Sequence, residues 1–195
     1  MISLSFKNKT SLAIFLLFSI MASKLFKSSI KIGMNAIYAK EGLCSFHLDE
    51  SANVTFNNSY SQFLSDSFVY VYKNASLIFN GNFILNYGSM LRCEKSISFG
   101  NDVMVGNYSI VSDSDGHPHS VMGNPVEFRK PIIIGNHVWV GSGVYIMKGI
   151  KIGNNVTIGA KTIVTKDIPN NVTVFNRAEL KVIEDTNWKY SLLTK

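Results

Sequence analysis

The sequence has few cysteines, little charge and no apolar run that would span a bilayer comfortably. The two cysteines, Cys44 and Cys93, lack the spacing of a metal site, so we interpret them as reduced, buried thiols rather than a disulfide or a nucleophile. The 19 Lys and Arg residues form no dense basic stripe and no DNA-binding motif, which makes nucleic acid the weaker choice of partner. The net charge of +6 instead favours anionic partners, such as coenzyme phosphates, acidic glycans or an anionic membrane surface.

A regular apolar repeat is the dominant feature of the chain. Hydrophobic residues make up 46% of the 195 residues and charged residues 16%, a balance that suits stacked coils around an apolar interior. An aliphatic residue recurs every six positions, at Ile134, Val140, Ile146, Ile152, Ile158 and Val164. Glycine follows four of these six directly, at Gly135, Gly141, Gly153 and Gly159. A helix repeats at about 3.6 residues and a strand at two, so this period predicts short strands joined by tight corners in a parallel β-helix.

The extent of the repeat predicts the domain organisation. The pattern extends back from residue 132 through Cys93, Phe99, Val105 and Val111. It weakens before Cys93, so residues 40–92 are expected to form less regular coils. We predict an all-β solenoid over residues 40–175, an apolar and basic segment over residues 1–39, and a C-terminal tail over residues 176–195.

The N-terminal segment contains an unbroken apolar run with one serine, Leu12 to Ala22, which follows Lys7 and Lys9. We interpret it as a short helix that caps the end of the solenoid or lies at a membrane surface through residues 1–30. A signal peptide is the alternative. The capping interpretation fits a cytoplasmic protein, peripheral at the inner face of the membrane if the helix contacts lipid.

A loop interrupts the repeat. The step from Val111 to Ile134 is not a multiple of six, so the chain leaves the coil over residues 112–131. This excursion carries a group of polar side chains, namely Asp113, Asp115, His117 and His119. A histidine beside a carboxylate has the parts of a general base, while a plain solvated loop is the alternative. Together with His137, the two loop histidines could supply three nitrogens to a metal, but the ligand spacing is unconventional and we expect no metal.

Three motifs resemble the hexapeptide-repeat O-acetyltransferases. They are GHP at Gly116 to Pro118, PIIIGNHVWVGSGV at Pro131 to Val144 and IGAKTIVTKDIP at Ile158 to Pro169. The resemblance covers roughly residues 80–170 and is to the galactoside and maltose acetyltransferases and their relatives in bacterial surface-polysaccharide clusters. It implies a left-handed parallel β-helix with a protruding catalytic loop, acetyl-CoA as the donor, and a homotrimer with active sites between subunits.

The resemblance also implies roles for individual residues. The family's catalytic histidine falls on His117, and its oxyanion donor is a backbone N–H that falls on Ser142. Trp139 would form a wall near donor and acceptor. The residues expected along the coenzyme A groove are Trp139, Ser142, Ala160, Thr165, Lys166 and Arg177. Asn86 matches a family asparagine that contacts the acceptor. Beyond the resemblance, we expect Asp113, Asp115 and His119 on the loop to contact the acceptor, with simple exposure as the alternative for His119.

One segment departs from the family pattern. The loop that closes the coenzyme groove contains glycine and proline in the family and reads Phe175-Asn176-Arg177-Ala178 here. The charge of Arg177 could compensate at a coenzyme phosphate. We therefore expect an acetyl-CoA-dependent O-acetyltransferase of a bacterial surface glycan. The alternatives are an acetyltransferase of simple sugars or antibiotics, a catalytically inactive binding solenoid, and a metal-dependent hydratase.

Overall fold

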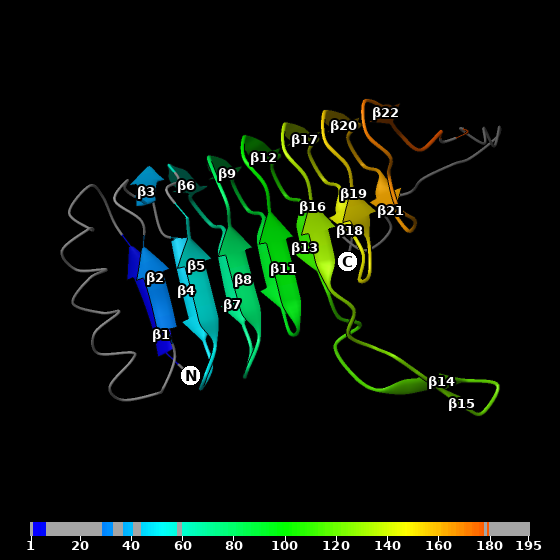
Figure 1. Cartoon of the computed structure of the whole chain (residues 1–195), viewed down its shortest axis with the longest axis horizontal. Helices are drawn as coiled ribbons and strands as arrows, with labels where there is room; N and C mark the ends of the chain where they lie inside the picture. The colour runs from blue at the N-terminus through cyan, green and yellow to red at the C-terminus, as the bar shows by residue number, and fades with distance from the viewer. Residues whose placement is uncertain are drawn as a thin grey trace, which may run out of the picture.

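A computed structural model of the chain describes residues 2–6, 29–32, 37–40, 44–57, 60–177 and 179. The described residues form a solenoid whose coils contribute one strand to each of three sheets, except that the last coil has strands in only two of them (Figure 1). The three sheets are called A, B and C. Sheets B and C are parallel throughout, and sheet A is parallel from β4 (Cys44–Leu48) onward. At its N-terminal edge, β1 pairs antiparallel with β4. Within the described ranges there is no helix of the length and hydropathy that a bilayer crossing requires.

The strands of each sheet follow one another along the solenoid axis. Sheet A contains β1 (Ile2–Phe6), β4 (Cys44–Leu48), β7 (Phe68–Val71), β10 (Met90–Cys93), β13 (Ile110–Ser112), β18 (Tyr145–Ile146) and β21 (Ile163–Val164). Sheet B contains β2 (Ser29–Ile32), β5 (Asn53–Phe56), β8 (Ser76–Phe79), β11 (Ser96–Phe99), β16 (Ile132–Ile134) and β19 (Lys151–Ile152). Sheet C contains β3 (Ile37–Lys40), β6 (Ser61–Leu64), β9 (Phe83–Leu85), β12 (Val103–Val105), β17 (Val138–Val140), β20 (Val156–Ile158) and β22 (Thr173–Val174).

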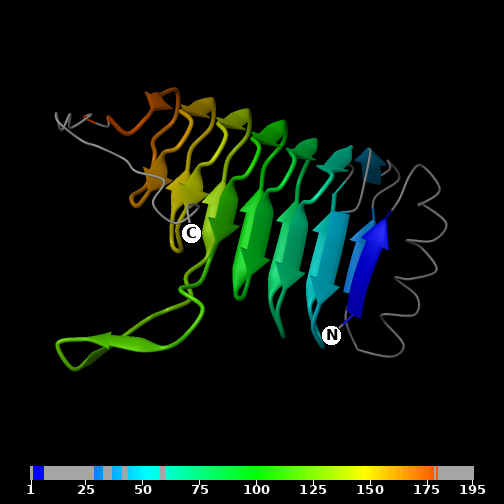
Figure 2. The same ribbon diagram turned by 180° about the vertical axis from the view of Figure 1, so that it is seen from behind.

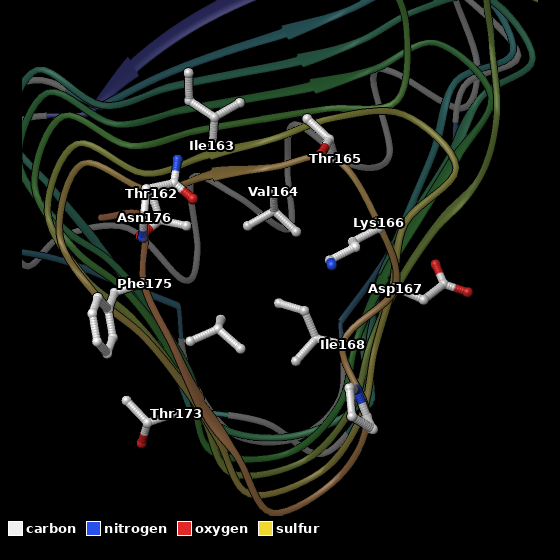
Figure 3. Close-up of a pocket in the computed structure, with 12 residues that line it drawn as sticks. Thr162, Ile163, Val164, Thr165, Lys166, Asp167, Ile168, Thr173, Phe175 and Asn176 are labelled. Carbon is white, nitrogen blue, oxygen red and sulfur yellow. The ribbon is translucent and has the colours of Figure 1, made fainter. Parts of the chain in front are cut away.

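The coil is left-handed, as the resemblance implied. Figure 3 looks down the solenoid with the last coil in front, and its labelled residues run clockwise from Thr162 through Lys166 and Ile168 to Phe175. A chain that advances toward the viewer while it turns clockwise is left-handed, against the usual right-handed rule for parallel crossovers. The predicted left-handed parallel β-helix is therefore confirmed.

The six-residue pattern marks the inward-facing side chains. Val140, Ile146 and Ile158 are fully buried, and strands alternate buried with outward residues. In the earlier coils, aromatic rings take over this role, and Phe56, Phe79 and Phe99 stack along sheet B with ring centroids 4.7 and 5.3 Å apart. A continuous apolar column therefore runs through the centre of the coils.

Coil length explains why the pattern weakens before Cys93. In the later coils, Val140 pairs with Ile158, a step of three six-residue units. The sheet register of the early coils pairs Phe46 with Val69 and Val69 with Leu91, so each of these coils is longer than three such units. The less regular early coils were thus predicted correctly, although their strands stack in the same three sheets.

The corners of the later coils are held by a ladder of asparagines. The backbone N–H of Asn101 donates to Oδ1 of Asn136 at 2.8 Å, and that of Asn136 donates to Oδ1 of Asn154 at 2.7 Å. The glycine before each asparagine keeps this approach open, because a Cβ on Gly135 would lie 2.5 Å from Asn154 Oδ1. The glycine at a fixed phase of the repeat is therefore needed for the close stacking of adjacent coils.

The parallel sheets begin before the predicted boundary at residue 40. Strands β2 and β3 lie within residues 1–39 or at their edge and pair in parallel with β5 and β6. The short helix predicted over residues 12–22 lies outside the described residues, as does most of the predicted tail over residues 176–195.

The predicted excursion from the coil is confirmed. Strand β13 ends at Ser112 and β16 begins at Ile132, and the chain between them leaves the solenoid. Its outer part is an antiparallel hairpin of β14 (His119–Val121) and β15 (Asn124–Val126). Figures 1 and 2 show this hairpin projecting away from the coils, with the residues before it close to the body of the solenoid.

Candidate functional site

The excursion starts at a buried carboxylate. Asp113 is fully buried, and its side chain accepts hydrogen bonds from the backbone N–H groups of Glu94 at 2.7 Å, Lys95 at 2.8 Å and Ser96 at 2.7 Å. Burial raises the pKa of the Asp113 carboxyl, and the three N–H donors offset part of that rise. This carboxylate is enclosed and holds the corner between β10 and β11, so it offers no exposed atom for the predicted acceptor contact.

A second buried carboxylate ties the returning end of the excursion to the coil. Glu94, whose side chain is 2% exposed, pairs with Arg92 and with Arg129, each at 2.7 Å. Burial opposes ionisation of Glu94, but hydrogen bonds from Arg129 and Ser114 and the charge of Arg92 outweigh it, so the pKa lies below its usual value. Arg92 also packs on the loop, because a Cβ on Gly116 would lie 3.3 Å from its Nη2.

This ion-pair cluster makes stability depend on pH. We expect Glu94→Gln to lower the free energy of unfolding by about 1–3 kcal/mol at neutral pH, because two guanidinium groups lose a charged acceptor. A carboxyl whose pKa is lowered by folding contributes stability above its unfolded-state pKa and loses it as the pH falls through the folded-state value. The difference between wild type and variant should therefore shrink in acid, as measured by urea unfolding. An equal difference at neutral and acid pH would contradict this assignment.

His117 lies exposed on the loop next to Gly116. Its Nδ1 lies 3.3 Å from the carbonyl oxygen of Pro118. A carbonyl can only accept, so Nδ1 carries the hydrogen and donates it, which leaves Nε2 as the basic nitrogen. The loop thus presents an imidazole in the tautomer that a general base requires.

The carboxylate predicted beside the catalytic histidine, Asp115, lies beside His119 and not beside His117. Oδ2 of Asp115 lies 3.6 Å from Nδ1 of His119 and also contacts Nζ of Lys148, in the segment between β18 and β19. The ring centroids of His117 and His119 are 6.4 Å apart, edge to face. His119 is therefore half-buried beside a carboxylate, rather than simply exposed.

Trp139 points outward from β17, as predicted. Its side chain is 57% exposed and lies between Met104 and Thr157 on the neighbouring strands of sheet C. These residues line an apolar groove of about 880 Å³, with Tyr60 and His137 at its margins. The groove places an aromatic wall on the outer face of the sheet.

Ser142 lies exposed at the corner that follows this strand. Its carbonyl oxygen accepts the N–H of Lys161 at 2.9 Å, while its own N–H has no acceptor among the residues that the structure describes. Ala160 occupies the equivalent corner one coil later, since a Cβ on Gly141 would lie 2.8 Å from its backbone nitrogen. The predicted oxyanion donor is therefore a backbone N–H that is available for hydrogen bonding, on a rigid corner.

The other predicted coenzyme residues gather at the C-terminal end of the solenoid. Thr165 and Lys166 line a cavity of about 450 Å³ together with Phe175 and Asn176. Lys166 extends across the open end of the last coil, whereas Phe175 points outward (Figure 3). Arg177 follows Asn176 and is exposed. A cationic side chain thus lies within the cavity, and a second comes directly after a lining residue in the sequence.

Asn86 has a structural hydrogen bond. Its Nδ2 donates to the carbonyl oxygen of Val105 on the next coil at 2.9 Å, so its carboxamide oxygen and the second Nδ2 hydrogen remain for the predicted acceptor contact. Sequence reasoning missed three residues that shape the loop, namely Arg92, Glu94 and Lys148. Arg92 and Glu94 are near neighbours, but Glu94 reaches Arg129 and Lys148 reaches Asp115 across more than 30 residues, and no local motif marked these pairs. Among the described residues, no group of three or more His, Cys, Asp and Glu side chains converges as a metal site would require.

Comparisons with known proteins identify relatives of the repeat and of the fold. The family described as bacterial transferase hexapeptide (six repeats) matches residues 131–166. The galactoside O-acetyltransferase of Escherichia coli is 35% identical over 121 residues, which cover 61% of this chain and 59% of that protein. The chain therefore spans less than two thirds of the length of this relative.

Solved structures share the fold at low sequence identity. The polySia specific acetyltransferase NeuO has a TM-score of 0.55 at 21% identity, covering 86% of this chain and 91% of NeuO. A mutant of AntD, an N-acyltransferase from Bacillus cereus, has a TM-score of 0.59 at 14% identity, covering 84% of this chain and 86% of AntD. Residues 131–166 thus carry the bacterial transferase hexapeptide repeat on a fold shared with solved acyltransferases, and the predicted resemblance to the hexapeptide-repeat family is confirmed.

Proposed function

We propose that this chain is an acetyl-CoA-dependent O-acetyltransferase that modifies a hydroxyl group of a bacterial surface glycan. The observation that carries the proposal is His117, an exposed imidazole with a basic Nε2, on a loop that interrupts a hexapeptide solenoid. The similarity to a galactoside O-acetyltransferase supports a sugar hydroxyl as the acceptor.

The chemistry follows from the tautomer of His117. Its Nε2 takes the proton of the acceptor hydroxyl as that oxygen attacks the thioester carbonyl carbon of acetyl-CoA. The carbonyl oxygen becomes an oxyanion, which the N–H of Ser142 stabilises. Collapse of this intermediate breaks the carbon–sulfur bond, and the imidazolium returns its proton to the coenzyme A thiolate. The hydrogen bond from Nδ1 to Pro118 keeps the ring in the required orientation throughout.

Acetyl-CoA is the proposed donor. Lys166 and Arg177 offer positive charge to its phosphates at the end of the last coil, and Thr165 adds a hydroxyl nearby. The corner residues Ser142 and Ala160 offer backbone groups on two successive coils before that end. The altered loop supplies Phe175 in place of the family's small residues, so the adenine contacts differ in detail.

A surface glycan is the proposed acceptor. The net charge of +6 suits an acidic polymer, and one fold neighbour, NeuO, is described as polySia specific. We infer a homotrimer in which the exposed groove around Trp139 adjoins the loop of a neighbouring copy. Because the donor is a cytoplasmic metabolite, we place the protein in the cytoplasm.

Release of coenzyme A tests the proposed function. Purified protein, acetyl-CoA and a panel of bacterial glycans and simple glycosides should give acceptor-dependent thiol release, followed with a thiol reagent. Calorimetry with acetyl-CoA runs alongside. A catalytically inactive solenoid is the second candidate, because the loop at Phe175 to Arg177 lacks the family's glycine and proline. If the protein neither releases coenzyme A nor binds acetyl-CoA, the inactive solenoid is favoured and the transferase is rejected.

A further inference from the structure

Asp115 joins two parts of the molecule that are far apart in sequence. Its carboxylate contacts Lys148 from the following coil and lies 3.6 Å from Nδ1 of His119. The three side chains are largely sheltered, with 24% of Asp115, 16% of Lys148 and 34% of His119 exposed. The backbone N–H of Asp115 also donates to the carbonyl oxygen of Phe128 at 2.9 Å, which fixes the carboxylate from the main chain. The group therefore places an anchored carboxylate beside His119 on the loop.

This arrangement determines which edge of the His119 ring faces outward. Nδ1 is buried and has no partner within hydrogen-bond distance, and Asp115 is its nearest charged neighbour. A carboxylate can only accept, so the tautomer with the hydrogen on Nδ1 is favoured. The exposed part of the ring then carries Nε2 with its lone pair, which can accept a hydrogen bond from a hydroxyl group.

Two basic imidazole nitrogens therefore lie on one loop. The ring centroids of His117 and His119 are 6.4 Å apart with an interplanar angle of 81°. Each ring offers one basic nitrogen, and a hydrogen bond to an oxygen spans about 2.8 Å, so this spacing suits two oxygens of one acceptor molecule. Adjacent hydroxyl groups of a sugar offer such a pair of oxygens.

We propose that His119, oriented by Asp115, is an acceptor-binding residue that recognises the hydroxyl next to the one that is acetylated. The inference rests on the proposed function, with His117 acting on the reacting hydroxyl. Asp115 is a positioning residue, and Lys148 holds it against the following coil. The acceptor class is thereby a sugar with two neighbouring hydroxyl groups rather than an isolated alcohol.

The test separates acceptor binding from the chemistry of the donor. Coenzyme A release is measured with methyl galactoside, methyl glucoside and a methyl sialoside, with their single-deoxy derivatives, and with water alone. His119→Ala should lower kcat/KM for the preferred glycoside by about 10–100-fold, mainly through KM, since one substrate hydrogen bond is lost. Hydrolysis of acetyl-CoA by water should be unchanged, which also demonstrates that the variant folds.

Deoxy acceptors and a double variant give the decisive comparisons. Wild type and His119→Ala should act equally on the glycoside that lacks the neighbouring hydroxyl. Asp115→Ala should show the same loss as His119→Ala, and the double variant no further loss, because both remove one contact. His47→Gln, on the outer face of β4, is the matched histidine control and should behave as wild type.

The outcomes distinguish the two proposals. If wild type releases coenzyme A with a glycoside but His119→Ala keeps its kcat/KM, the inference about His119 is overturned and the transferase stands. Equal losses on the full and the deoxy glycosides would likewise overturn the recognition of a second hydroxyl. If none of the glycosides makes wild type release coenzyme A faster than water alone does, the proposed function and this inference are both rejected.

Discussion

His117→Ala is expected to lower kcat for acetyl transfer by about 10²- to 10⁴-fold, the range that positioned general bases contribute. The side chain lies exposed on the loop, and its hydrogen bond runs to the carbonyl of the next residue, Pro118. Its removal therefore leaves the core untouched, and surface substitutions of this kind change stability by about 0.5 kcal/mol or less. A large kinetic loss with an unchanged melting temperature would be the signature of a catalytic residue.

The measurement pairs single-turnover transfer with thermal unfolding and with calorimetric binding of acetyl-CoA. The dissociation constant for acetyl-CoA should stay within a few-fold of wild type, because the imidazole acts on the acceptor hydroxyl. His117→Gln serves as a second variant, since it retains a polar side chain but no basic nitrogen. Near wild-type turnover in either variant would remove His117 from the mechanism, even if transfer itself is established.

The architecture was predictable because the same six-residue pattern of buried and turn-forming residues recurs along the chain. Each six-residue unit buries one aliphatic side chain, and glycine recurs where adjacent coils approach most closely, so the period alone indicates short stacked strands. The same regularity exposes the excursion, because the step from Val111 to Ile134 breaks the count of six. The early coils were harder to delimit, since the pairing of Phe46 with Val69 closes a coil longer than three repeat units, whose extra corner residues have no fixed phase.

The site was predictable only where side chains point outward from regular positions. Trp139 lies between two inward valines, so its exposure follows from strand alternation. Asp113 and Asp115 are both acidic neighbours of the loop histidines, but one is buried under three backbone donors and the other pairs with Lys148. The burial of Asp113 and the pairing of Asp115 depend on contacts with residues that are remote along the chain, which the sequence pattern does not encode.

Gly141→Val is expected to destabilise the solenoid by about 3 kcal/mol or more, the upper range for overpacked sites. A Cβ at this position would lie 2.7 Å from the carbonyl oxygen of Ile158 and 2.8 Å from the backbone nitrogen of Ala160. Both atoms belong to the backbone of the next coil and cannot rotate away as a side chain could. The two coils must separate, which lengthens the 2.8 Å hydrogen bond from the Gly141 N–H to Ile158.

Gly123→Ala is the control that shows whether lack of space, rather than backbone strain, causes the destabilisation by Gly141→Val. Gly123 has a φ of +80°, yet a Cβ there meets nothing within 4 Å, so its replacement should lower stability by only about 1–2 kcal/mol, the strain of a left-handed residue. Urea unfolding of both variants against wild type makes the comparison. Gly141→Val should also impair transfer before it unfolds the protein, because Ser142 follows directly and its N–H moves with the corner. If Gly141→Val unfolds at the same urea concentration as wild type, close stacking of adjacent coils is not what selects glycine in this repeat.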